Sequence, residues 1–457
     1  MIRYDSYKLF GLLDDDRNLN RAIPRAENRI CATEEQMIEV LESLGVEGEV
    51  RRIIRSPGYV MYTVALLGSD GYTKLKKREK RIASYFDVES VRVVTTNVRR
   101  AEEKLVNIEI AKPEADPITL RSVQSAVTMY NFSTSSVSIG RTANRLSIPC
   151  NIDEGLLIAG KDAESVQNCI NSIVMSLLCT VSPDDLEFRL TGEGNDSFEC
   201  FKDIPHLCGD DVTSAYMDIK AEFDRRRGIF EEAGCRSISD YNAMRGFFDE
   251  KPMPELVWVI DDIDACRDYK AEILREIAML GKESGIIVIA GCHDLESVRL
   301  KVLTEIFKNR IAFRVDTKEA SLKFPGIEGA EKLVGNRDML FSTPSRTVRM
   351  LNATVSREEM IRVAAYLKEN YKEGARVPEE LSDEELFKNV VEMLKLKGFI
   401  SAMKVARLYG VSPEKAEEMI RKLDELEYCE VRSDGPVLQA IVKREYRHRE
   451  RGSRDGR

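Results

Sequence analysis

The chain has 457 residues, 43% hydrophobic and 32% charged, which is enough apolar material for the cores of roughly two to four domains and excludes a disordered chain. No apolar stretch approaches the ~18 residues that cross a bilayer, and acids stand where a signal peptide is apolar, so we expect a cytoplasmic protein without a membrane segment. The net charge of −9 excludes a uniformly basic surface for nucleic acid, although a ring can enclose a basic channel within an acidic exterior.

The first third of the chain predicts a small α+β domain. Residues 1–33 form an extension without sustained periodicity, and residues 34–149 form the domain. A helix starts after Thr33, whose hydroxyl can cap it. Strands are predicted over residues 59–68 and 88–98, with a basic helix over residues 72–86 between them.

The pattern of apolar and polar residues changes at about residue 150, and residues 150–375 predict an α/β core. Short apolar strands such as EGLLIAG, ELVWVIDDID and GIIVIAGC alternate with amphipathic helices. Strands that are apolar throughout are typical of a mostly parallel sheet covered on both faces, as in P-loop nucleotide-binding folds. We therefore predict a P-loop NTPase-type core.

The last part of the chain predicts a winged helix-turn-helix. Residues 376–382 have the proline and acid content of a linker, and residues 383–442 contain three helices followed by two strands around a Ser-Asp-Gly turn. Ser412 is placed to cap the third helix, with Pro413 at its first position. Residues 443–457 are a basic tail, which is either a solvated segment or a phosphate-binding arm.

The ten cysteines are scattered, without a CxxC pair, and the chain has only three histidines. This pattern does not match the ligand spacing of zinc sites. We expect reduced, mostly buried cysteines and no metal site built from them.

The order of these parts resembles the cytoplasmic motor of the FtsK/SpoIIIE family of DNA translocases, over residues 35–442. Five segments in the family's order carry the resemblance: EGLLIAG with the helix containing NCINSIVMSLL, DIPHLCGD with EFDRRRGIFEEAGCRSISDYN, ELVWVIDDID, NRIAFRVDTKEAS, and GAEKLVGNRDMLFS. The resemblance implies a RecA-like core, ATP and Mg²⁺ as ligands, double-stranded DNA as partner, and a ring of identical chains or a ring shared with an intact paralogue.

The phosphate loop departs from the family. A working loop needs glycines that wrap the phosphates, a lysine for the β and γ phosphates, and a Ser or Thr for magnesium. The matching stretch begins with Gly160 and Lys161, and a gap-free alignment puts Val166 at the lysine position and Gln167 at the hydroxyl position. The two chemical handles are missing.

Acids in the same stretch oppose nucleotide binding. Asp162 and Glu164 place negative charge where phosphates would bind. Two like charges at about 4 Å repel by about 1 kcal/mol in water and about 4 kcal/mol near a protein surface. Lys161 could offset part of this repulsion, but it stands too early in the loop.

The second nucleotide motif is less eroded. Asp261 stands where the family holds magnesium, and Asp262 replaces the family's catalytic glutamate with a side chain one methylene shorter. A misplacement of ~1 Å can cost on the order of a hundredfold in rate. Residues 192–194 and 291–293 also depart from the family's pattern, with Gly-Glu-Gly for Asp-Pro-Lys and Gly-Cys-His for Thr-Gln-Arg.

One further position matches the family. Arg310 corresponds to the arginine that family members direct toward a neighbour's nucleotide, where it stabilises developing charge. The alternative interpretation is an ordinary salt-bridged surface arginine.

The sequence does not decide whether the chain binds DNA. The third helix of the predicted winged helix offers Lys415, Arg421 and Lys422, but residues 381–442 hold twelve acids against nine bases, so a protein-contacting domain is the alternative. The runs of bases over residues 74–81 and 225–227 are other candidates, with a solvated helix face as the alternative for the first run.

The leading hypothesis is a ring-forming FtsK/SpoIIIE homologue that binds DNA or a partner translocase, with ATP hydrolysis impaired or absent. One alternative is a pseudo-ATPase scaffold subunit that binds neither DNA nor nucleotide. The other is an active translocase in which Lys161 replaces the missing lysine. The residues themselves predict no cofactor, although the resemblance implies ATP and Mg²⁺, and they favour a chain that is not an enzyme.

Overall fold

The computed structural model of the chain describes residues 6–14, 33–95, 104–112, 116, 118–124, 136–192, 198–208, 215–248, 251–266, 270–335, 337–371, 383–397, 399–402, 405, 412–426, 428–432 and 439–442. These residues belong to two compact units, Leu12–Ala365 and Met1–Gly11 with Tyr366–Arg457, and each is described by itself. The predicted linker and basic tail, and most of the predicted N-terminal extension, lie outside the described residues.

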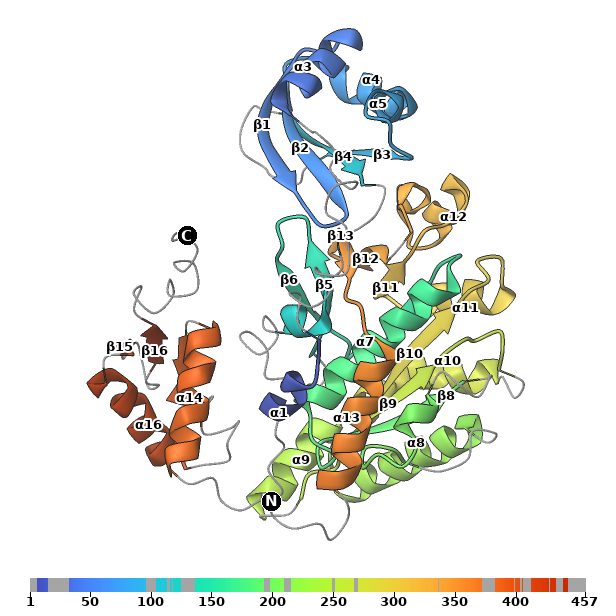
Figure 1. Cartoon of the computed structure of the whole chain (residues 1–457). Helices are drawn as coiled ribbons and strands as arrows, with labels where there is room; N and C mark the ends of the chain where they lie inside the picture. Colours follow the sequence, from blue (N-terminus) through green and yellow to red (C-terminus); the bar gives the residue numbers. More distant parts are fainter. Residues whose placement is uncertain are drawn as a thin grey trace. The chain divides into compact units, whose positions relative to one another are not determined.

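The first part of the larger unit is an α+β module, defined here as residues 34–111. Its elements are α3 (Glu34–Ser43), β1 (Gly48–Arg55), β2 (Tyr59–Leu66), α4 (Gly71–Lys77), α5 (Glu79–Tyr85), β3 (Val91–Thr95) and β4 (Lys104–Ala111) (Figure 1). The antiparallel sheet has the order β1-β2-β4-β3, and its apolar side chains share one core with those of the three helices. The predicted cap is confirmed, because Thr33 and Gln36 form a capping box at the start of α3.

The prediction of one basic helix over residues 72–86 was wrong. The helix breaks at Arg78, whose backbone leaves the helical region at φ −116° and ψ 19°. The Arg78 guanidinium donates to the carbonyl of Leu44 at 3.1 Å. Two short helices therefore follow one another where the sequence pattern indicated one.

The core of the larger unit is a nine-stranded sheet with the order β6-β5-β13-β12-β11-β7-β10-β9-β8. Its strands are β5 (Ser136–Thr142), β6 (Ser147–Asn151), β7 (Leu156–Ala159), β8 (Leu186–Thr191), β9 (Glu255–Ile260), β10 (Ile286–Cys292), β11 (Arg310–Ala312), β12 (Asp338–Thr343) and β13 (Arg346–Asn352). From β11 to β8 all neighbours are parallel, and from β11 to β6 all are antiparallel. The predicted α/β fold class is confirmed, whereas β5 and β6 of this sheet begin before residue 150, within the range 34–149 that was predicted for the α+β domain. The sheet also has an antiparallel half that the sequence did not indicate.

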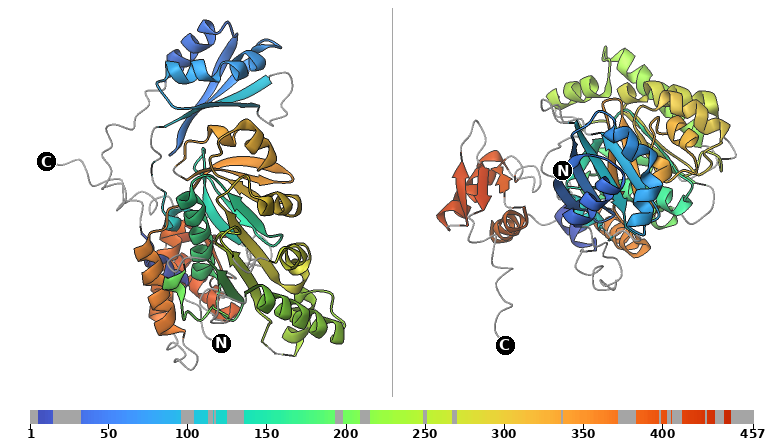
Figure 2. Two further views of the ribbon diagram at one scale, coloured as in Figure 1. Left: turned by 90° about the vertical axis from the view of Figure 1, so that its right-hand side faces the viewer. Right: turned by 90° about the horizontal axis from the view of Figure 1, so that it is seen from above.

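Helices cover both faces of the parallel half, as the two-sided burial of its strands requires. The described helices of this region are α7 (Ala163–Thr180), α8 (Ala215–Glu232), α9 (Ile238–Phe247), α10 (Ala271–Leu280), α11 (Val298–Ile306), α12 (Lys318–Lys323) and α13 (Arg357–Asn370), with short 3₁₀ turns η1 (Glu199–Phe201), η2 (Gly281–Ser284) and η3 (Ala330–Lys332). Apolar residues of α8, α10 and α11 share one core with the face that includes Leu157 and Trp258. Figure 2 shows α7 on the opposite face of the sheet.

The smaller unit contains a three-stranded antiparallel sheet with the order β14-β16-β15. Its described elements are α1 (Ser6–Gly11), α14 (Asp383–Lys397), β14 (Phe399–Ser401), α16 (Pro413–Glu425), β15 (Cys429–Arg432) and β16 (Gln439–Val442). Ser412 caps α16, as predicted. The predicted middle helix lies mainly outside the described residues, so the winged helix-turn-helix stays a prediction.

No helix in the described part of the chain is long and apolar enough to cross a membrane.

Candidate functional site

The candidate site lies at the carboxyl edge of the parallel strands. The chain leaves β7 and enters the sheet again at its far edge, in β8, so the strand order reverses beside β7. Open α/β sheets bind ligands at such a reversal, outside the carboxyl ends of the strands. β7, β9 and β10 are parallel neighbours and end at this edge, so the segments that follow them, which the sequence singled out, all begin there.

The phosphate loop is short, and its backbone is already engaged. β7 ends at Ala159 and α7 begins at Ala163, which leaves three residues between them. The N–H of Gly160 donates to the carbonyl of Cys292 at 3.4 Å, and the N–H of Lys161 donates to the carbonyl of Arg314 at 3.0 Å. These donors are therefore not directed at a ligand. A Cβ on Gly160 would lie 2.5 Å from the Cβ of Phe313, so packing alone requires this glycine.

The first turn of α7 carries its own anion. Asp162 is the N-cap residue: its Oδ1 accepts from the N–H of Glu164 at 3.3 Å, and its Oδ2 accepts from the hydroxyl of Ser165. A helix N-terminus attracts negative charge because its first N–H groups lack helical partners. The Asp162 carboxylate therefore bonds to an N–H group at the helix N-terminus, the kind of group that binds phosphate in a working loop.

The two key positions of the loop are helical and lack the family's chemistry. Val166 is fully buried, and its N–H donates to the carbonyl of Asp162 at 3.2 Å. The Gln167 amide donates to Asn171 Oδ1, one turn later, at 3.2 Å. Lys161, the candidate replacement cation, pairs its Nζ with Asp316 Oδ1 at 2.7 Å in an exposed ion pair.

The second motif follows β9 and is tightly packed. Asp261 is 7% exposed. A Cβ on Gly291 would lie 2.1 Å from the Asp261 carbonyl oxygen, so this glycine allows the close approach of two backbones. Asp262, in the position of the catalytic glutamate, accepts at Oδ1 from the N–H of Asp264 at 3.0 Å. Its carboxylate thereby stabilises the turn that carries it.

One group of three ligand atoms in the described residues is close enough to hold a metal ion. Oxygens of Asp262 and Asp264 and the Cys292 sulfur lie within 4.8 Å of one another. The Cys292 thiol donates to Asp264 Oδ2 at 3.4 Å, and the Ser297 hydroxyl donates to Asp264 Oδ1 at 2.6 Å. Burial and the Asp264 charge raise the pKa of the Cys292 thiol well above its usual range. The group is thus stable as a hydrogen-bonded cluster of thiol and carboxylates.

The candidate arginine is committed to backbone carbonyls. Arg310 donates through Nε to Phe307 at 2.9 Å, through Nη1 to Pro325 at 3.4 Å, and through Nη2 to Thr304. Burial lowers the pKa of its guanidinium. Arg310 therefore joins the end of α11 to the segment after α12 within this chain, and its role toward a neighbour's nucleotide stays a prediction.

Comparison with known proteins gives a family match that includes the segments of the candidate site. The FtsK/SpoIIIE family model matches residues 148–359. The DNA translocase FtsK of Oceanobacillus iheyensis is 24% identical over 430 residues, covering 87% of this chain and 54% of that protein. The DNA translocase FtsK of Caldanaerobacter subterraneus subsp. tengcongensis is 24% identical over 449 residues, covering 92% and 62%. The part of this chain from residue 148 to residue 359 therefore belongs to the FtsK/SpoIIIE family.

The chain spans about half the length of the curated FtsK relatives it matches. Among solved structures, the cytoplasmic domain of the Thermomonospora curvata Type VII secretion ATPase EccC is similar, at 22% identity and a TM-score of 0.49 over 58% of this chain and 36% of that one.

The candidate DNA-binding residues have partners within the smaller unit. Lys415 pairs with Asp383 at 2.5 Å, and Arg421 lies 3.6 Å from Glu417. The Lys422 ammonium lies 4.9 Å from the ring centre of Phe387, in a cation–π contact.

The other basic runs are partly structural. In the α+β module, Lys74 and Lys76 donate to the carbonyls of Gly45 and Val93 at 3.0 and 3.1 Å. On α8, Arg226 is 1% exposed and donates to the carbonyls of Ser284 and Gly285 and to Glu222. These three side chains therefore already make bonds within the chain that stabilise the fold.

Sequence reasoning missed a residue that fixes the first turns of α7. Asn168 donates through Nδ2 to Asn352 Oδ1 at 2.6 Å and to the Ala353 carbonyl at 2.8 Å, and its Oδ1 accepts from the Val355 N–H at 3.1 Å. The partners lie more than 180 residues away in the chain. An asparagine within an apolar helix was the only local signal.

Proposed function

We propose that this FtsK/SpoIIIE family member has lost ATP hydrolysis and serves as a DNA-binding, assembling subunit that forms rings with itself or with an intact paralogue. The observation that carries the loss of hydrolysis is the start of α7, where the Asp162 carboxylate caps the helix in place of a phosphate. A nucleotide would have to displace this bonded carboxylate and approach Glu164 as well.

Three further observations support the loss. The lysine position is a fully buried valine, the loop N–H groups donate to Cys292 and Arg314, and Lys161 pairs with Asp316. Together they remove two parts of what phosphoryl transfer needs: a cation at the β and γ phosphates and a backbone cradle. Arg310 is likewise held by carbonyls of its own chain.

The DNA-binding and ring-forming part of the proposal rests on kinship. Matched relatives are named DNA translocases, and this chain is similar to them over most of its length. Double-stranded DNA binding should fall steeply with salt, because phosphate contacts release counterions.

A second candidate function is a scaffold subunit that binds neither DNA nor nucleotide. The partners of Lys415, Arg421 and Lys422 within the smaller unit favour it, because a cation that is already paired gains less from a phosphate. Retention of a partner protein without retention of DNA would support this candidate over the first.

A third candidate, an active translocase that uses Lys161, needs that side chain to leave Asp316. Two measurements on the purified chain together test all three candidates. The first is phosphate release from ATP with and without double-stranded DNA, and the second is binding of double-stranded DNA at low salt, followed by fluorescence anisotropy. We expect DNA binding without DNA-stimulated phosphate release. Release that Asp261→Ala abolishes would revive the active translocase, and absence of DNA binding would leave the scaffold.

A further inference from the structure

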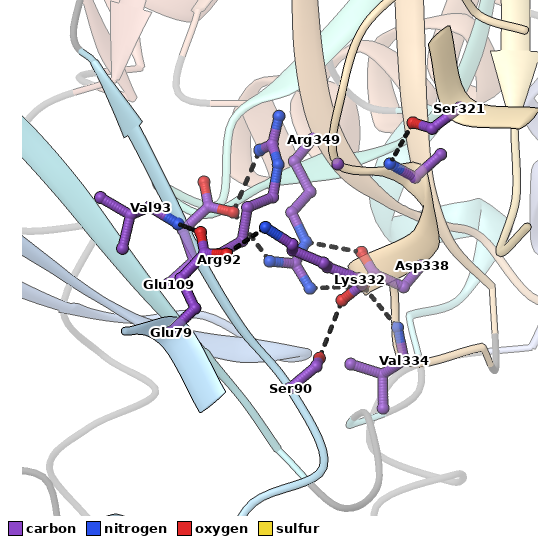
Figure 3. Close-up of polar contacts among 12 residues, drawn as sticks. Glu79, Ser90, Arg92, Val93, Glu109, Ser321, Lys332, Val334, Asp338 and Arg349 are labelled. Atoms are coloured by element: carbon purple, nitrogen blue, oxygen red, sulfur yellow. Dashed lines mark hydrogen bonds and ion pairs between the residues drawn. The ribbon is translucent and has the colours of Figure 1, made fainter. Parts of the chain in front are cut away.

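A cluster of buried, paired charges lies where the α+β module meets the core, away from the nucleotide motifs. We call it the charge seam and define it as Glu79, Ser90, Arg92 and Glu109 of the module and Lys332, Asp338 and Arg349 of the core (Figure 3). Its pairs Glu109–Arg349 and Glu79–Lys332 connect the two parts noncovalently.

Arg349 is the centre of the charge seam. It comes from β13 of the core, and its side chain is 2% exposed. Nε and Nη2 donate to both oxygens of Asp338, on the neighbouring strand, at 3.0 and 2.6 Å. Nη1 donates to Glu109 of the module at 2.7 Å, and the guanidinium lies 4.2 Å from the ring centre of Tyr59. Arg349 of the core thus donates through all three of its side-chain nitrogens, and one of these bonds reaches Glu109 in the sheet of the module.

The same Glu109 carboxylate accepts a second arginine. Arg92, on β3, donates through Nη1 at 3.1 Å to the oxygen that Arg349 also contacts. Gly329 of the core makes room for Arg92, because a Cβ at this glycine would lie 2.4 Å from Arg92 Nε. Two arginines and two carboxylates, each at most 9% exposed, therefore alternate across the boundary.

Lys332 adds a second point of attachment. Its ammonium pairs with Glu79 of α5, which also accepts from the N–H of Val93 at 2.7 Å. Its carbonyl accepts from the hydroxyl of Ser90 at 2.8 Å. The module therefore binds both ends of this lysine, and Figure 3 shows these contacts beside those of Arg349.

We propose that the charge seam is a clasp that holds the α+β module to the core in one fixed orientation, so that the two move as one body. The physical reason is the cost of a mismatch. A slide or rotation of the module would separate Arg349 from Glu109 and Lys332 from Glu79, the ion pairs of the charge seam that cross the boundary, and a buried charge that loses a partner is far more costly than an altered apolar contact.

The clasp also reaches the candidate site through one strand. Arg349 and Asn352 belong to β13, and Asn352 accepts from Asn168 of α7 and donates to the Ile139 carbonyl and the Ser172 hydroxyl. β13 thus contacts the module through Arg349 and contacts α7 through Asn352. The fixed orientation therefore includes the first turns of α7.

Single-molecule energy transfer on the full chain tests the clasp. Dyes are placed at the exposed Lys80 of the module and Lys308 of the core through an unnatural amino acid, which leaves the native cysteines untouched. We expect one narrow distance distribution for the parent chain. Arg349→Met should raise the population with other distances on the order of a hundredfold, because it leaves Glu109 and Asp338 without their shared cation.

Arg51→Met is the matched control, since it removes the same charge from an exposed ion pair of the module with Glu49. Its distribution should stay narrow. Glu109→Gln, nearly identical in volume, is the second variant if Arg349→Met does not fold, and it should broaden the distribution as well. A broad distribution in the parent chain, or a narrow one in a folded Arg349→Met or Glu109→Gln variant, would overturn the proposal.

Discussion

The start of α7 and the charge seam both set carboxylates against positive charge, but they differ in burial and in what that charge can do. Asp162 and Glu164 are exposed at a helix terminus, where each interaction is weak and its main effect is to exclude another anion. Glu109, Asp338, Arg92 and Arg349 are buried, where each charge needs its partner. The same residue types therefore close a ligand site in one region and join two parts of the fold in the other.

The largest expected effect is in the charge seam. Arg349→Met leaves two buried carboxylates without their shared cation, so the free energy of unfolding should fall by about 3–5 kcal/mol. Lys161→Met, which removes a cation from the exposed pair with Asp316, should change it by no more than about 1 kcal/mol. Chemical denaturation of both variants measures the contrast, and equal losses would mean that burial does not distinguish the two regions.

Restoring the family's lysine should lower the free energy of unfolding almost as much as Arg349→Met does, and it should not restore ATP binding. Val166→Lys places an ammonium at a fully buried position of α7, where an unpaired charge is expected to cost about 3 kcal/mol or more. Gln167→Lys, one residue later and only half-buried, should be tolerated. Melting curves and ATP titrations of both variants test this, and a stable Val166→Lys chain that binds ATP would show that the loop retains its cradle.

Acid should weaken the charge seam at a pH set by Glu109. Burial raises the pKa of this carboxyl, but the charges of Arg92 and Arg349 outweigh burial and hold it below its ordinary value of 4.5. The unfolded chain therefore binds the proton more readily, so this stabilisation is complete above about pH 4.5 and is lost as the pH falls further, through the lowered folded-state value. Asp338 and Tyr59 also face this cluster.

The difference in unfolding free energy between the parent chain and Glu109→Gln, followed from pH 7 to pH 3, isolates this carboxyl. It should be constant near neutral pH and shrink in acid. A difference that grows in acid would contradict the assigned direction of the pKa shift.

The smallest effect is expected at the helix cap. Asp162→Ala removes the side chain that accepts from Glu164 and Ser165, and loss of an N-cap usually costs about 1 kcal/mol. Ala163→Gly, at the next position of the same turn, changes the backbone without touching the carboxylate. Thermal melts compare the two, and Asp162→Ala should still bind no ATP, because Val166 and the engaged loop N–H groups are unchanged.

The sequence predicted the parts of the site that depend on local order. The strand before the loop, the helix after it and the positions of Val166, Gln167, Asp261 and Asp262 follow from short contiguous segments. The sequence could not indicate that α7 begins as early as Ala163, because this depends on the hydrogen bonds that Asp162 forms in the folded chain.

The charge seam had no local signal at all. Glu109 and Arg349 are 240 residues apart, and Arg92 resembles any other basic residue of a half-buried strand. The antiparallel half of the sheet was missed for a related reason. The antiparallel arrangement of β5, β6, β12 and β13 depends on their pairing with one another, which no short segment of sequence indicates. Arg310 could not be placed either, because its partners are backbone carbonyls of Thr304, Phe307 and Pro325.

Calorimetric titration of the intact chain with ATP and Mg²⁺, with and without double-stranded DNA, tests the closed phosphate loop most directly. We expect no heat of binding under either condition, because the Asp162 carboxylate and the backbone carbonyls already use the groups that would hold the phosphates. Binding in the micromolar range would contradict it and return this family member to the class of ATP-driven motors.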